Sequence, residues 1–170
     1  MTPDGTADRL LPGLRTPSNQ VSRRAVTYWT ARAALNGLVV VAVEVVVVIA
    51  GGLAPGWWIA VALSAIIGAV HAAIMPHWRY RVHRWEVTDQ ALYTRSGWFS
   101  VQWRIAPISR IQTIDSHRSL GERIFGLANV TASTASAAGP VHIRGLERST
   151  ADRLLDELAI ATGQIPGDAT

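Results

Sequence analysis

Cysteine and lysine are both absent from this 170-residue chain, and charged residues of either sign are scarce. Without cysteine the chain has no disulfide framework, no thiolate metal ligand and no thiol nucleophile. Charged residues make up 16% of the sequence, well below the share of about 25% in average soluble domains. The net charge is nevertheless +4 and is carried by arginine. Such a balance favours acidic partners such as phospholipid headgroups or nucleic acid, but discriminates weakly between them. We expect membrane lipid as a partner and no nucleic acid.

Recognisable catalytic and metal-binding motifs are also missing. The sequence contains no P-loop, nucleophile elbow, dinucleotide fingerprint or metalloprotease helix. Asp115, Ser116 and His117 are adjacent, but neighbouring residues of a strand point to opposite faces, so they cannot form a triad by themselves. The histidines after the second apolar run lack the spacing of metal ligands: His77, His83, His117 and His142. We therefore expect a non-enzymatic protein with no cofactor and no metal.

Two long apolar runs dominate the first half of the chain. They cover Ala33–Leu53 and Trp57–Met75, and each has about the 20 residues that a helix needs to cross a bilayer. Only Ala54–Gly56 separates them, which suits a tight turn between antiparallel helices. A buried pair of soluble helices is the alternative, but residues 39–49 are apolar on every helical face except at Glu44. A cleavable signal peptide would have a shorter apolar core and no polar chain of about 30 residues before it.

The flanking residues predict how this transmembrane hairpin is oriented. Arginines precede the first run and follow the second, whereas the connecting loop is uncharged. The positive-inside rule then places both termini in the cytoplasm, with residues 1–32 as a cytoplasmic tail of a cell-membrane protein. Aromatic residues stand at the predicted ends of the spans, where such rings settle at headgroup level: Tyr28, Trp29, Trp57, Trp58, Trp78 and Tyr80.

Four polar residues lie inside the two spans. In an antiparallel hairpin, positions whose numbers have nearly the same sum lie at the same depth, which pairs Asn36 with His71 and Glu44 with Ser64. One interpretation is a proton or ion relay in an oligomer, because ionisable groups in membranes often mark such sites. The other is hydrogen bonding that holds the helices together.

The chain after Met75 changes to short alternating stretches that predict an antiparallel sheet. Six candidate strands are Tyr80–Thr88, Ala91–Ser96, Phe99–Ala106, Ile108–Asp115, Leu127–Thr134 and Val141–Arg144. A final helix is expected to begin at Ser149 as the N-cap and to end at Gly163. Its buried stripe comprises Ala151, Leu154, Leu155, Leu158, Ala159 and Thr162.

This second half resembles the membrane-anchored bacterial pleckstrin-homology (PH) family, type two. The resemblance covers about residues 80–163 and rests on Trp85–Asp89, Arg95 with Gly97, Ile105–Gln112 and Leu120–Val130. It implies a strongly bent sheet of seven strands closed by the C-terminal helix, with residues 164–170 as a tail. Since only six strands are predicted, one is missed or split, and a β-bulge near His83 and Arg84 would account for it. The resemblance implies docking of lipid or protein and no defined activity.

Arginines are the candidate contacts to lipid headgroups or other anions. Three of them follow the second span directly, where an anionic leaflet attracts each basic residue by about 1 kcal/mol. Fixing the topology is the alternative role for these three. The remaining candidates are distributed over the predicted sheet, where an anion site at its open end is the alternative to scattered solvated charges. The complete set is Arg79, Arg81, Arg84, Arg95, Arg104, Arg110 and Arg123.

Three functional hypotheses follow. The first is a non-catalytic interaction module that docks a protein partner or organises a membrane complex, including a complex of identical chains. The second is sensing of anionic lipid headgroups by the arginines. The third is an ion pathway in an oligomer that uses Glu44 and His71.

Overall fold

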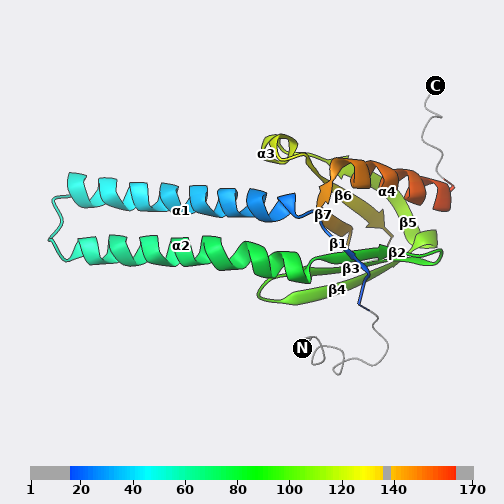
Figure 1. Cartoon of the computed structure of the whole chain (residues 1–170), viewed down its shortest axis with the longest axis horizontal. Helices are drawn as coiled ribbons and strands as arrows, with labels where there is room; N and C mark the ends of the chain where they lie inside the picture. Colours follow the sequence, from blue (N-terminus) through cyan, green and yellow to red (C-terminus); the bar gives the residue numbers. More distant parts are fainter. Residues whose placement is uncertain (1–15, 136–138, 164–170) are drawn as a thin grey trace.

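A long helical hairpin projects from one side of a β-rich domain in the computed structural model (Figure 1). The structure describes residues 16–135 and 139–163. Residues 1–15 of the predicted N-terminal tail and the predicted C-terminal tail 164–170 lie outside the described residues. Both ends of the hairpin enter the same domain, so residues 16–23 and the chain after α2 lie on the same side of it.

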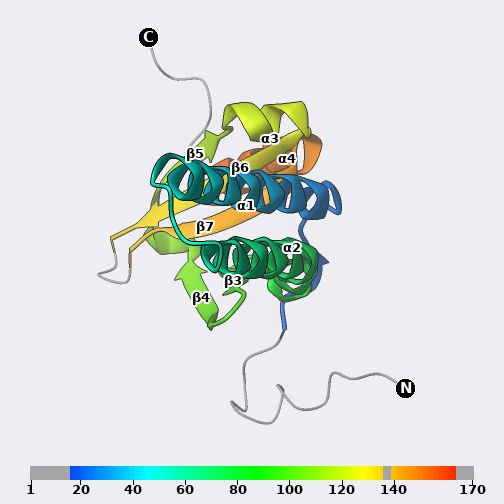
Figure 2. The same cartoon turned by 90° about the vertical axis from the view of Figure 1, so that its left-hand side faces the viewer.

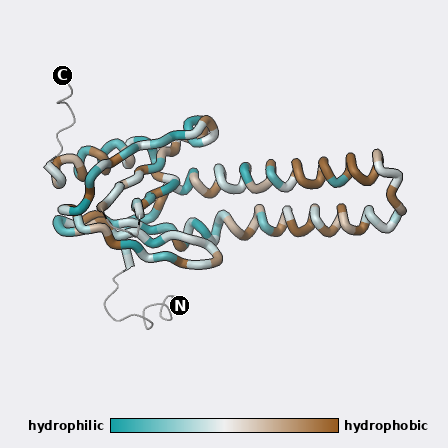
Figure 3. Tube along the Cα trace, turned by 180° about the vertical axis from the view of Figure 1, so that it is seen from behind, coloured by the Kyte–Doolittle hydropathy of each residue, from teal (hydrophilic) through white to brown (hydrophobic). Residues whose placement is uncertain are grey.

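The hairpin consists of α1 (Arg24–Ala50) and α2 (Trp57–Val82), both long and apolar enough to cross a membrane. Hydrophobic residues surround the part of both helices that is distant from the domain (Figure 3). Leu38 and Ile67 are 66% and 68% exposed, and most of the other large apolar side chains of the hairpin are exposed too. Exposed hydrophobic surface on all sides of a helix pair is stable in lipid rather than in water.

The two helices approach each other closely at a pair of glycines. A Cβ atom built on Gly37 would lie 3.8 Å from Cα of Gly68, and the reciprocal distance is 3.7 Å. Small residues at such a crossing let two backbones pack directly, which is a common way for transmembrane helices to associate. This contact fixes the register in which the polar residues of the two helices face each other.

The domain contains two antiparallel sheets with strand orders β1-β2-β3-β4 and β5-β6-β7. Within the described residues the strands are β1 (Asn19–Gln20), β2 (Arg84–Val87), β3 (Ala91–Gly97), β4 (Val101–Pro107), β5 (Ile111–His117), β6 (Leu127–Thr134) and β7 (Val141–Glu147). Helix α4 (Arg148–Ala161) packs across β5, β6 and β7. Its buried stripe includes Ala151, Leu154 and Leu158, as its helical spacing predicted.

Residues 19–32, directly before the predicted first span, pack with the domain. Strand β1 pairs with β2, and the Tyr80 hydroxyl donates a hydrogen bond of 3.3 Å to Oε1 of Gln20. Val21 and the first turns of α1, through Ala25 and Trp29, are buried in the domain core. The hairpin and the domain therefore share one hydrophobic core.

The predicted strand Tyr80–Thr88 is wrong in its first half. Helix α2 continues seven residues beyond the predicted end of the span at Met75, and β2 begins only at Arg84. Extending a formed helix costs little, and the extension buries Val82 to 6% exposure in the domain. The alternation of Tyr80 and Val82 that suggested a strand is also compatible with the last turn of a helix.

The seventh strand is β1, and the bulge expected near His83 and Arg84 does not account for it. His83 is the C-cap of α2, with φ −73° and ψ 106°, so the chain passes there directly from helix to strand. Strand β1 has two polar residues and no hydrophobic alternation, and only its pairing with β2 defines it.

Two further local predictions are corrected by the structure. The predicted strand Ile108–Asp115 begins with the 3-10 turn η2 (Ile108–Arg110), through which the chain crosses from the first sheet to the second. Ser149 is not the N-cap of α4, because that helix starts after Glu147 without a side-chain cap. A capping box is found instead at Ser119 and Glu122, where it begins the short helix α3 (Leu120–Ile124).

Candidate functional site

Three cavities meet around Arg79, where the hairpin joins the domain. The first, of about 490 Å³, lies between α1 and α2; the others, of about 600 and 350 Å³, lie between the hairpin and the sheets. We call the last two together the junction groove. The residues that matter in its lining are Arg32, Arg79, Arg104, Glu122, His142 and Arg144.

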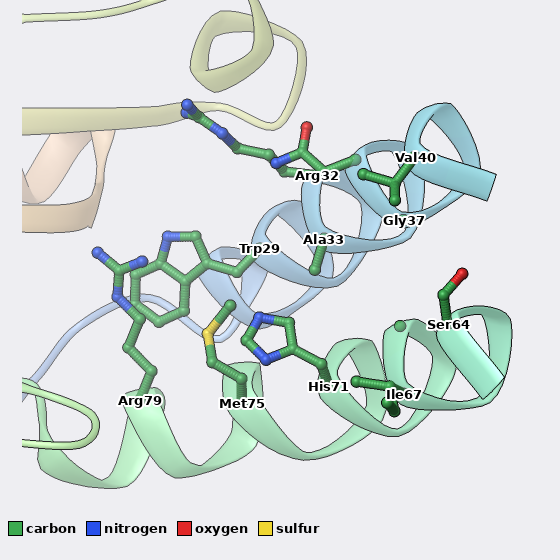
Figure 4. A pocket seen from close by; sticks show the side chains of 12 residues that line it. Trp29, Arg32, Ala33, Gly37, Val40, Ser64, Ile67, His71, Met75 and Arg79 are labelled. Atoms are coloured by element: carbon green, nitrogen blue, oxygen red, sulfur yellow. The ribbon is translucent and has the colours of Figure 1, made fainter. Parts of the chain in front are cut away.

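The hairpin contributes Arg32 and Arg79 to the junction groove. The Arg79 guanidinium stacks over the Trp29 ring at 4.3 Å from its centroid, and its Nε lies 3.5 Å from Nε2 of His83. Arg32 donates a hydrogen bond of 3.3 Å to the Tyr28 hydroxyl. Figure 4 shows Arg79 beside the Trp29 ring, whereas Arg32 extends away from α2. Both arginines lie just outside the predicted spans, at the level expected for lipid headgroups.

The domain contributes the opposite wall of the groove. His142 and Arg144 alternate with buried residues along β7, so both face outward from that strand. Nδ1 of His142 lies 3.1 Å from the Thr131 hydroxyl on β6. On β4, Arg104 donates a hydrogen bond of 2.9 Å to the carbonyl oxygen of Pro140. The groove is thus lined by basic side chains from both the hairpin and the sheets.

The positive charge of this region contributes to lowered pKa values of two neighbouring histidines, His83 and His142. Burial lowers the pKa of His83 to about 4, and the charges of Arg79 and Arg144 add to this effect against an opposing hydrogen bond to the Arg79 carbonyl. Burial also lowers the pKa of His142, assisted by Arg144 and Arg104. Both rings are therefore disfavoured as cations by burial and by the same group of arginines.

Glu122 is the one carboxylate that lines the described junction groove, and it is engaged by other partners. It accepts hydrogen bonds from the Ser119 backbone at 2.8 Å and from Nδ2 of Asn129 at 2.6 Å. Burial raises the pKa of Glu122, but these hydrogen bonds outweigh it and hold the pKa below its ordinary value. In the described part of the chain, Arg32, Arg79 and Arg144 belong to none of the ion pairs.

The arrangement suits a phosphate or carboxylate anion. Three guanidinium groups without a carboxylate partner surround a recess, and guanidinium binds such oxyanions by two parallel hydrogen bonds. The described residues contain no group of three side chains able to hold a metal ion. Since Arg32 and Arg79 flank the predicted spans, we expect the groove to lie near the level of the lipid phosphates.

Only two of the seven candidate arginines line the junction groove, namely Arg79 and Arg104. Arg81 is exposed on α2. Arg84 on β2 lies opposite Arg95 on β3 in the register of the two strands. The Arg95 guanidinium lies 5.2 Å from the Trp103 ring. Arg110 and Arg123 line two other recesses of the domain.

Arg32 and Arg144 were not among the candidate contacts in the sequence. Arg32 carried a usable signal, because the depth rule that pairs Glu44 with Ser64 places it near Arg79. Arg144 shares a strand face with His142, but local alternation does not reveal that this face meets the hairpin.

The polar residues inside the spans lie between the helices in two groups. The Ser64 hydroxyl donates a short hydrogen bond to Glu44, the pairing that their depth predicted. Asn36 and His71 both line the cavity between α1 and α2, into which His71 and Met75 point in Figure 4. The His71 ring also contacts the Trp98 ring, with centroids 5.5 Å apart. The ion pathway stays a prediction.

Comparison with known proteins agrees with this architecture. A family model described as "Bacterial PH domain" matches residues 34–162, about three quarters of the chain. The chain belongs to the bacterial PH domain family. It is also 32% identical, over 152 residues, to the UPF0699 transmembrane protein YdbS of Bacillus subtilis (strain 168), covering 84% of this chain and 91% of that relative. No solved structure matches the chain.

Family membership and the two apolar helices together define a membrane protein that carries a bacterial PH domain. The matched residues include the hairpin and the sheets from β2 onward. Strand β1 and the first turn of α1, which complete the domain core, precede the matched region.

Proposed function

We propose that this bacterial PH protein is a non-catalytic membrane module that binds the phosphate of an anionic lipid headgroup in its junction groove. The domain lies on the cytoplasmic face of the cell membrane, as the arginines flanking the hairpin favour. The observation that carries the proposal is that Arg32, Arg79 and Arg144 all line one groove and that none of them belongs to an ion pair in the described part of the chain.

The position of the groove favours a lipid over a soluble anion as the source of the phosphate. Arg32 is one residue before the predicted first span, and Arg79 is four residues after the second. Both therefore stand within about one helical turn of the hydrocarbon boundary. A lipid bound there stays in its leaflet, and the negative surface potential of an anionic leaflet attracts the same arginines.

The test uses the full chain in neutral detergent and short-chain phosphatidylglycerol as the probe. Short-chain phosphatidylcholine and inorganic phosphate serve as the other arms. We expect binding of phosphatidylglycerol that weakens as salt rises, with weaker binding of both alternatives. Equal binding of inorganic phosphate would assign the groove to a soluble anion, and equal binding of phosphatidylcholine would contradict headgroup recognition.

Replacement of one arginine locates the site. Charge-assisted hydrogen bonds contribute about 1.5–3 kcal/mol, so R144Q should weaken phosphatidylglycerol binding roughly tenfold to a hundredfold. R153Q is the matched control, because Arg153 is exposed on α4 and bonds to Ser149 and Thr150 of its own helix. A similar loss in both variants would indicate nonspecific attraction by net charge.

Docking of a protein partner is the second candidate function, and the position of β5 at one edge of its sheet favours it. Strand β5 forms one edge of its sheet, and five of its seven residues are exposed. Such an edge can pair with an added strand of another chain, including a second copy. I114P on this strand should abolish crosslinking to a partner in intact membranes if β5 carries the interaction.

A further inference from the structure

Apolar side chains stand exposed at two places on the hairpin side of the domain. One is the turn between β3 and β4, with Trp98 and Phe99, and the other is α3, with Leu120 and Ile124. We name these four residues the apolar tips. We propose that the apolar tips insert into the interfacial layer of the same leaflet from which the hairpin emerges, and so hold the domain against the membrane.

The depth of the β3–β4 turn is set by its contact with the hairpin. Trp98 packs edge-on against His71, which lies within the second apolar run. His71 precedes Arg79 by eight residues, so this contact lies about 12 Å farther along α2 from the domain. Phe99 stands beside this contact and is 92% exposed. The turn therefore reaches the level at which the hairpin itself faces lipid.

The backbone of the turn holds these rings outward. Gly97 has φ +127°, and a Cβ atom there would lie 1.9 Å from the carbonyl oxygen of Ser100. Only glycine fits this position, so the chain reverses tightly and leaves Trp98 and Phe99 at the apex. A rigid turn with two aromatic rings suits the membrane interface, where aromatic side chains are enriched.

Helix α3 presents its apolar residues on one face. Leu120 and Ile124 are 78% and 82% exposed and are four residues apart, so they are neighbours on the helix surface. Another side of α3 packs against the hairpin. A Cβ atom on Gly121 would lie 2.8 Å from the Tyr28 ring, which also contacts the Phe125 ring in a tilted arrangement with centroids 5.6 Å apart. Tyr28 belongs to the predicted belt of interfacial aromatic residues.

The charges near α3 match this orientation. Leu120 and Ile124 line a recess together with Arg118, Arg123 and Arg148. An apolar face with an arginine rim is typical of helices that lie in the plane of an anionic membrane surface.

The two places that carry the apolar tips flank the hairpin on opposite sides. Figure 2, viewed along the hairpin, shows α3 on the side of α1 that faces away from α2, and β4 on the side of α2 that faces away from α1. Figure 1 shows α3 and the β3–β4 turn on the side of the domain from which the hairpin projects. A flat leaflet crossed by the hairpin covers both places at once, which makes the bilayer the occupant that fits their common orientation.

The absence of native cysteine permits a direct test with the full chain. F99C and I124C are each labelled with a nitroxide in lipid nanodiscs that hold a single copy. Accessibility to oxygen, which partitions into lipid, is compared with accessibility to a water-soluble nickel complex. We expect both sites to favour oxygen over nickel severalfold.

I160C is the matched control for exposure. Ile160 is 79% exposed in the last turn of α4, which lies on the opposite side of the domain from the hairpin (Figure 1). This site should be open to nickel. Equal nickel accessibility at Phe99, Ile124 and Ile160 would overturn the proposal. So would protection that appears only in vesicles with many copies, because a second chain would then cover the apolar tips.

Discussion

Arg79 connects the hairpin and the domain through a single side chain. Its guanidinium stacks on Trp29 of α1, lies next to His83 at the end of α2 and lines the groove that β7 closes with Arg144. Cation–π contact stabilises a guanidinium by about 0.5–2 kcal/mol, which compensates in part for the missing carboxylate. The charge of Arg79 also disfavours the protonated form of His83, the buried histidine beside it.

We expect His83 to make the domain sensitive to acid. Its pKa is about 4 in the folded protein, below the ordinary value of 6.5, mainly because the ring is buried and secondly because Arg79 is near. The unfolded chain therefore binds a proton first as pH falls. Stability is complete above about pH 6.5, declines as pH falls toward 4, and the decline amounts to about 3 kcal/mol.

The measurement is the free energy of unfolding in detergent as a function of pH for the wild type and H83N. Asparagine keeps a donor for the Arg79 carbonyl but does not titrate in this range. His142 and Glu122 titrate in both proteins, so the difference between the two curves isolates His83. Parallel curves would show that the pKa of His83 is the same in the folded and the unfolded chain, which would contradict the prediction.

Helix α1 belongs both to the apolar hairpin and to the core of the domain. Its distant part is exposed and apolar, whereas Ala25 and Trp29 in its first turns are buried with β7. The backbone N–H of Ser22 donates a hydrogen bond of 2.9 Å to the Gly145 carbonyl, which joins the chain before α1 to β7. The junction between hairpin and domain is therefore packed rather than linked by a loop.

Gly145 is the position at which this packing is most easily disrupted. Its φ is +78°, and a Cβ atom would lie 2.9 Å from Cβ of Ala25 and 3.1 Å from the Trp29 ring. G145A should lower the free energy of unfolding by about 2–4 kcal/mol, from backbone strain together with overpacking. Faster amide hydrogen exchange in the first turns of α1 should accompany this loss.

Gly139 provides the matched control for backbone strain. It has φ +79°, but a Cβ atom there would meet nothing within 4 Å. G139A should therefore cost only about 1–2 kcal/mol and leave exchange in α1 unchanged. Equal losses in the two variants would mean that strain alone acts at Gly145 and that the contact with α1 contributes nothing.

For the whole molecule, the shared core restricts how the domain can sit on the membrane. The hairpin enters the domain through both α1 and α2, and the cores of the two parts are continuous through Tyr28 and Trp29. A double connection of this kind resists rotation far more than a single flexible linker does. The direction of the hairpin therefore determines which face of the domain meets the leaflet.

Cysteine labelling tests the proposed orientation of the protein. A54C places a thiol in the α1–α2 loop and S109C places one in η2, both at exposed positions. An impermeant maleimide should label A54C in intact cells and S109C only after the cells are permeabilised, because the flanking arginines retain the domain inside. Labelling of S109C in intact cells would reverse the orientation.

Local pattern and length by themselves determined several features of this protein. The apolar runs predicted the helix pair because a bilayer span needs a long unbroken stretch, whatever else the chain does. The pairing of Glu44 with Ser64 followed from the constant rise of a helix. The buried stripe of α4 followed from helical periodicity, and motif residues indicated the family.

Only the tertiary structure decided the remaining features. Strand β1 is two polar residues long and exists through pairing with β2, more than 60 residues away in the chain. Helix α2 extends to Val82 because the domain buries that side chain, and local alternation could not show this. Arg32 and Arg144 line the same groove because α1 packs against β7. Periodicity reports which face of an element is buried, whereas contacts between distant elements decide what that face meets.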